Sequence, residues 1–123
     1  MLDAARPYLD PGEKARVAAD VLKGPKTVLA SLLSPIGFFM LERPRYAVLT
    51  KRRLLLVIPP ARARGRSGLD AAWSREDLEV ESFGTPGIWT RMVLRTPDGR
   101  VGLNFSRAWR DQAEIIHAQI ARG

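Results

Sequence analysis

The chain has 123 residues, the size of one domain with a single hydrophobic core. Hydrophobic residues make up 46% and charged residues 27%, which favours a globular protein over a disordered tail. Lys and Arg outnumber Asp and Glu by 20 to 13, so the net charge of +7 favours acidic partners, and the lack of cysteine excludes disulfides, thiol nucleophiles and cysteine-based metal sites.

The N-terminal part is predicted to contain a lead-in and one strand. Residues 1–12 are expected to be irregular and to close with an Asp-Pro-Gly turn. Within residues 13–23 every second residue is apolar, which is the period of a half-buried strand. These residues are Ala15, Val17, Ala19 and Val21. An alanine-rich helix is the competing interpretation, and a Gly-Pro pair ends either element.

Residues 27–41 form the most hydrophobic stretch. It falls short of the ~20 apolar residues that span a bilayer, and Pro35 and Gly37 interrupt it. One interpretation is a short helix or hairpin packed against its own domain or a second subunit. The other is a loop that dips into a membrane or grips an apolar ligand. Because no apolar signal-peptide core is visible at the N-terminus, we expect a cytoplasmic protein.

The central part predicts a hairpin and a further strand. Two β-branched and aromatic runs, 46–50 and 53–58, are separated by a Lys-Arg pair and end at two prolines, which cannot donate to a ladder. Residues 61–68 form a basic, glycine-containing loop, and 69–73 are expected to be the next strand.

The following residues predict a helical turn and an acidic strand. The Ser-x-x-Asp spacing of 74–77 suits one capped helical turn. In 78–83 one set of residues, Leu78, Val80 and Ser82, alternates with another, Glu79, Glu81 and Phe83. This alternation sends Glu79 and Glu81 to the solvent face, opposite Leu78 and Val80.

The C-terminal part predicts a hairpin that leads into a helix. Residues 88–95 and 100–105 flank a Thr-Pro-Asp-Gly sequence, a strong signal for a tight turn. Ser106 is the expected N-cap of an amphipathic helix, because its hydroxyl can accept a hydrogen bond from a first-turn amide. The apolar face of this helix consists of Trp109, Ala113, Ile116 and Ile120.

Seven short strands and one C-terminal helix predict an α+β, mainly β fold, with residues 13–123 as one domain. Seven twisted antiparallel strands would curl into two orthogonal layers or an open barrel. The amphipathic helix is the natural plug for the uncovered end.

This order, the hairpin with the sequence YAVLTKRRLL, and Trp109 early in the last helix resemble the pleckstrin-homology (PH) superfold, particularly bacterial PH-like domains, over residues 13–121. The resemblance implies that the helix tryptophan packs onto the barrel core. It implies little about function, because the family includes phosphoinositide binders, peptide binders and scaffolds. The basic signature of the phosphoinositide binders can be laid on Lys26, Arg43 and Arg45.

Further candidate ligand residues come from the basic residues themselves. They are Lys51, Arg52 and Arg53 at the hairpin turn and Arg62, Arg64 and Arg66 in the following loop. Arginines can bind phosphate oxygens through charge-assisted hydrogen bonds. The alternative is a solvated loop that keeps the protein soluble. The candidate membrane or interface contacts are Leu33, Ile36, Phe38 and Phe39.

The sequence does not favour catalysis, and we expect no cofactor and no metal site. His117 is the only histidine and lies beside the apolar helix face, where a packed histidine is the expected role. We therefore expect a non-catalytic module that binds an anionic membrane lipid at the inner membrane face, or an acidic protein partner. The alternatives are a homo-oligomeric or peptide-binding scaffold without a lipid ligand, and a basic nucleic-acid-binding domain.

Overall fold

The structure is a computed structural model that describes residues 2–24, 43–59, 68–85 and 89–121. Seven antiparallel strands form one sheet in the order β4-β3-β2-β1-β7-β6-β5. The strands are β1 (Ala15–Lys23), β2 (Arg43–Thr50), β3 (Arg53–Val57), β4 (Leu69–Ser74), β5 (Glu79–Gly84), β6 (Thr90–Thr96) and β7 (Gly99–Phe105). The helix α5 (Arg110–Ala121) follows them, so the expected mainly β, α+β fold is confirmed.

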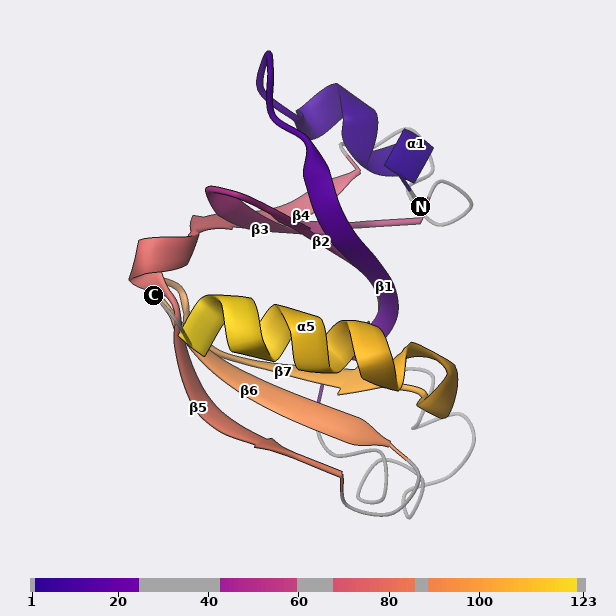
Figure 1. Cartoon of the computed structure of the whole chain (residues 1–123), viewed down its shortest axis with the longest axis vertical. Coiled ribbons are helices and arrows are strands. Elements are labelled where there is room, and N and C mark those ends of the chain that lie inside the picture. Colours follow the sequence, from indigo (N-terminus) through magenta and orange to yellow (C-terminus); the bar gives the residue numbers. More distant parts are fainter. Residues whose placement is uncertain (1, 25–42, 60–67, 86–88, 122–123) are drawn as a thin grey trace.

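Strand β1 joins two layers of the folded sheet. It pairs with β2 along its whole length, from Ala15 opposite Thr50 to Lys23 opposite Arg43, but with β7 only through its last three residues. Figure 1 shows β1 passing from the layer of β2, β3 and β4 to the layer of β5, β6 and β7. Helix α5 lies in the opening between these layers and contacts β1, β5 and β6. The sheet is thus bent around the helix, as the sequence predicts for a helical plug.

The core follows from the alternation of apolar residues in the sequence. Val21 of β1, Leu54 of β3 and Leu94 of β6 are buried in one cluster with the apolar face of α5. Burying a leucine or isoleucine side chain stabilises a fold by about 1.5–3 kcal/mol. The buried residues of α5 are Ala113, Ile116 and Ile120, as expected, and Trp109 is half-buried against the same core.

The helix does not begin as expected. Ser106 has the extended backbone of an N-cap, but its side chain makes no capping hydrogen bond. A 3-10 turn, η3 (Arg107–Trp109), precedes α5, and the amide of Trp109 donates to the Ser106 carbonyl instead. The helical turn after β4 has the same character: η2 (Arg75–Asp77) is present, but the Ser74 side chain makes no capping hydrogen bond.

One face that strand alternation predicts, that of Phe83, needs correction. The register of β5 and β6 shifts between Val80 and Ser82, and the bulge turns Phe83 to the core side of the strand, where it packs against the core cluster. Glu79 and Glu81 stay on the exposed side, as expected.

The lead-in, expected to be irregular, contains a helix α1 (Leu2–Ala5) and a 3-10 turn η1 (Arg6–Tyr8). Ala5 is fully buried against a second apolar cluster, formed by the outward side chains of β2 and β3. These side chains are Val48, Leu55 and Val57. The N-terminal segment therefore covers the outer face of the first layer, where Figure 1 shows it.

Candidate functional site

A group of positively charged side chains surrounds a groove of about 700 Å³ where β1 begins beside the β2-β3 turn. We call it the basic groove. Four exposed cationic side chains line it, and they are Lys14, Arg16, Lys51 and Arg52. The remaining lining residues are Asp10, Pro11, Gly12, Glu13 and Ala15.

A β-bulge brings Arg16 to the groove. Ala15 lies opposite Thr50 and Val17 lies opposite Leu49, so Arg16 is the extra residue on the β1 side of this pairing. A bulge bends its strand and re-aims the inserted side chain. Arg16 therefore lines the groove. In a regular strand, alternation alone would decide on which face its side chain lies.

The backbone of the β2-β3 turn is held from both sides. The Thr50 hydroxyl oxygen accepts hydrogen bonds from the amides of Arg52 and Arg53, at 3.2 and 3.0 Å. On the other side, Arg75 donates its backbone amide to the Arg52 carbonyl at 2.8 Å and its guanidinium to the Lys51 carbonyl at 3.0 Å. The side chains of Lys51 and Arg52 are left exposed on a fixed turn.

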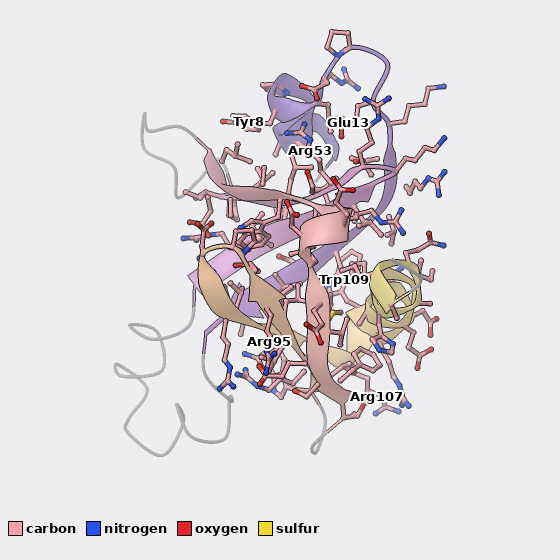
Figure 2. All side chains as sticks on the ribbon, turned by 90° about the vertical axis from the view of Figure 1, so that its left-hand side faces the viewer. Tyr8, Glu13, Arg53, Arg95, Arg107 and Trp109 are labelled. Atoms are coloured by element: carbon pink, nitrogen blue, oxygen red, sulfur yellow. The ribbon has the colours of Figure 1, made fainter. Side chains whose placement is uncertain are left out.

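Arg53, a predicted ligand residue, supports the groove from behind. Its guanidinium donates to both carboxylate oxygens of Glu13, with Nη2 2.5 Å from Oε1 and Nε 3.1 Å from Oε2. The Arg53 hydrogen bond is the main cause that lowers the pKa of Glu13 to about 2. Arg53 also donates to the Tyr8 carbonyl at 2.9 Å, and Figure 2 shows the three residues together.

This pairing decides the charge of the groove. Glu13 is neutralised by Arg53, and Asp10 lies 3.8 Å from the same guanidinium. Within the described structure, no ion pair involves any of the four cations of the basic groove. Arg53 cannot offset both carboxylates, but the four cations outnumber the one negative charge that is left, so the groove keeps an excess of positive charge.

Arg45, another predicted ligand residue, is engaged at the opposite end of the first layer. Its Nε lies 3.1 Å from an Asp70 oxygen that also accepts a hydrogen bond from Lys23 at 2.8 Å. Burial raises the pKa of Asp70, but the hydrogen bonds from Lys23 and Arg45 outweigh it, so the net direction is down. The Arg45 guanidinium also donates to the Pro44 carbonyl at 2.7 Å.

The described residues next to the two predicted basic clusters lie at opposite ends of the same strands. Lys51 and Arg52 precede β3, whereas the residues that flank the second cluster, Val57 and Leu69, lie at the other end of the β3-β4 pair. Several predicted residues lie outside the described part of the chain. These are Lys26, Leu33, Ile36, Phe38, Phe39, Arg62, Arg64, Arg66 and the side chain of Arg43.

Sequence reasoning missed Lys14 and Arg16. Both belong to the alternating pattern of 13–23, where they were assigned only to the polar face of a strand. The sequence feature that could have indicated a site is the presence of two cationic residues, Lys14 and Arg16, at the start of the predicted strand. The bulge that joins them to Lys51 and Arg52 leaves no recognisable mark in the sequence.

Three further observations concern the described residues. These residues contain no cluster of three or more His, Asp or Glu residues that could hold a metal ion. His117 stacks on Phe83 with ring centroids 4.2 Å apart and an interplanar angle of 3°. No described helix has the length and apolar character needed to cross a membrane. The comparisons with family models and with curated proteins found no match to this chain.

Proposed function

We propose that this chain is a non-catalytic, PH-like binding module that docks on an anionic membrane surface through the basic groove. The observation that carries the proposal is the set of four exposed cations around one groove, none of which forms an ion pair within the described structure. The seven antiparallel strands, the C-terminal helix and Trp109 against the core support the PH-like part, since the resemblance leads us to expect them.

The strength of such docking follows from the charge. Each Lys or Arg near an anionic leaflet contributes ~1 kcal/mol, so four give about 4 kcal/mol, which corresponds to roughly millimolar affinity. The attraction decays within a Debye length of ~8 Å at physiological salt. We therefore expect weak, reversible binding that increases steeply as salt is lowered.

The apolar stretch 27–41 is joined to the other end of β1. Strand β1 rises ~3.3 Å per residue, so its last residue, Lys23, lies roughly 26 Å from Ala15 at the groove. The basic groove and the Lys23 end of β1 could contact the same flat membrane only if the long axis of β1 were parallel to the membrane plane. The proposal consequently rests on charge, and apolar insertion by Leu33, Ile36, Phe38 and Phe39 remains a prediction.

The test is co-sedimentation with zwitterionic and anionic vesicles at low and physiological salt. The double variant Lys51→Glu/Arg52→Glu reverses half of the groove's cations. The matched control, Arg107→Glu/Arg110→Glu, changes the net charge equally at exposed positions. Figure 2 places Arg107 at the far end of the molecule from Glu13 and Arg53.

We expect the wild type and the control variant to sediment with anionic vesicles at low salt, and the groove variant to lose at least tenfold in affinity. Equal losses in both variants would show that net charge alone drives binding and would contradict a docking groove. Binding to duplex DNA with vesicles ignored would favour the nucleic-acid alternative instead.

A second surface fits the peptide-binding alternative. Strand β5 is an edge of the sheet, and a groove of about 500 Å³ lies between it and α5, with Phe83 and His117 in its lining. An extended peptide can add a strand at such an edge. In an NMR titration with candidate peptides, strand addition would shift the amides of β5 and leave those of the β2-β3 turn unchanged.

A further inference from the structure

A small pocket of about 220 Å³ lies where the end of β1 meets the start of the C-terminal helical region. Its walls come from four parts of the chain that are distant in sequence. The lining residues are Asp20, Val21, Leu22, Pro44, Trp89, Asn104, Ser106 and Trp109. It shares no lining residue with the basic groove.

The strand register builds the floor of this pocket. Leu22 lies opposite Pro44 of β2 on one side and opposite Asn104 of β7 on the other, so the three positions form a row across the sheet. Asp20 lies two residues before Leu22 on the same face of β1. Trp89 and Trp109 are both half-buried, and together they give the pocket an aromatic character.

Asp20 gives the pocket its charge. Its carboxylate makes no hydrogen bond or ion pair within the described structure, although the chain carries 20 Lys and Arg residues. The cations of neighbouring positions are engaged elsewhere: Lys23 and Arg45 bind Asp70, and Arg91 donates to the carbonyl of Gly24. Partial burial raises the pKa of the Asp20 carboxyl, and this outweighs the opposite effect of the positively charged N-terminus.

We propose that this pocket binds a small quaternary ammonium cation between its two tryptophans and the Asp20 carboxylate. Tryptophan faces attract organic cations, and quaternary ammonium recognition depends on such aromatic walls. The proposal does not depend on the basic groove, which would attract ligands of the opposite charge.

The remaining polar groups favour a cation without N–H donors. The side chain of Asn104 already accepts from Arg91 at 3.0 Å and donates to the Leu22 carbonyl at 3.3 Å. A guanidinium has five donors, more than the oxygens of Asp20 and Ser106 could accept, whereas a quaternary nitrogen has none. A Ca²⁺ or Mg²⁺ ion would need about six oxygen ligands, and the side chains here offer chiefly Asp20 and Ser106. The Ser106 hydroxyl, which does not cap the helix, can pair with a ligand hydroxyl.

The test uses choline as the probe, with binding followed by calorimetry and by tryptophan fluorescence. Trp73 is buried and donates to Asp98 at 2.8 Å, so we expect the ligand-dependent signal to come from Trp89 and Trp109. Sodium chloride at equal concentration controls for ionic strength. The neutral isostere 3,3-dimethylbutan-1-ol has the shape of choline without its charge.

We expect choline to bind at least tenfold more tightly than the neutral isostere. Asp20→Asn should lower choline affinity at least tenfold, Trp89→Leu severalfold, and the control Asp77→Asn, also at an exposed position, should have no effect. Equal responses to choline and sodium chloride, equal affinities for choline and its isostere, or an unchanged affinity in Asp20→Asn would each overturn the proposal.

Discussion

Arg53 shows how one partner decides the role of a basic residue. In the sequence it belongs to a run of three cations at a hairpin turn, and all three were candidates for a ligand. In the fold its guanidinium faces Glu13, whose side chain is only 7% exposed and also accepts from the Thr50 hydroxyl at 2.8 Å. A buried carboxylate with this many donors stays ionised at low pH. Arg53 is therefore occupied inside the fold, whereas its two neighbours are exposed and form no ion pair within the described structure.

The Glu13–Arg53 pair makes stability depend on pH in a defined window. The pKa of Glu13 lies at about 2 in the folded chain and near 4.5 when unfolded, so the folded state favours the ionised form. The pair's contribution is complete above about pH 4.5 and is lost as pH falls towards 2, by up to about 3 kcal/mol. In Glu13→Gln this component should be absent, leaving a flatter dependence of the unfolding free energy on pH.

Urea denaturation at several values between pH 2 and pH 7 measures this difference. Glu79→Gln, at an exposed position, is the control and should follow the wild type. Parallel curves for Glu13→Gln and the wild type across the window would contradict the assignment of the pair.

At the level of elements, the N-terminal segment is the feature that changes the surface most. Strands β2 and β3 carry apolar residues on both faces, because one face meets the core and the other meets α1 and η1. The Tyr8 hydroxyl accepts a hydrogen bond from the Gly68 amide at 2.7 Å. Gly68 permits this approach, since a Cβ there would lie 2.7 Å from the same hydroxyl oxygen. The segment thus fastens β3 and the start of β4 from outside.

Ala5→Glu tests whether this cover contributes to stability. A carboxylate cannot be buried among apolar groups without a partner, so we expect the segment to detach and uncover Val48, Leu55 and Val57. The loss in unfolding free energy cannot exceed the energy with which the N-terminal segment packs on the sheet, which we place at about 2–4 kcal/mol from the apolar area uncovered. Urea denaturation gives the loss, and increased binding of a hydrophobic dye reports the uncovered face. Ala108→Glu, at an exposed position, should change stability by no more than about 0.5 kcal/mol; equal stability of the two variants would show that the segment adds nothing.

At the level of the whole molecule, the elements that the sequence predicted are those that local patterns specify. Alternation is sufficient for β1 from Val17 onwards, because Val17 and Val21 face the core while Asp20 faces out, but the bulge places the predicted core-side Ala15 against the second cluster. The tight turn before Gly99 needs a positive φ, which is 109° there, and the sequence supplies glycine. Where only one residue shifts the register, as at the bulge before Ser82, alternation predicts the wrong face for Phe83.

The site was less predictable, because its members are joined by contacts between distant residues. Glu13 and Arg53 are 40 residues apart, and nothing in either local sequence indicates that they pair. Arg45 is likewise engaged by Asp70 of another strand. Lys51 and Arg52 were found because a hairpin turn exposes its residues, whereas Lys14 and Arg16 join them only through the pairing of β1 with β2.

The two proposed sites lie near opposite ends of β1 and should act independently. From Arg16 to Leu22 the strand rises roughly 20 Å, which exceeds the Debye length of ~8 Å at physiological salt. Charge at one site is therefore screened from the other. Lys51→Glu/Arg52→Glu should keep its choline affinity within about twofold, and Asp20→Asn should keep its affinity for anionic vesicles within the same range. Binding assays on the two variants measure both. A larger change would contradict independence and would show that the domain changes conformation between its ends. Because coupling between two binding sites is mutual, occupation of either site would then have to change the affinity of the other by the same factor.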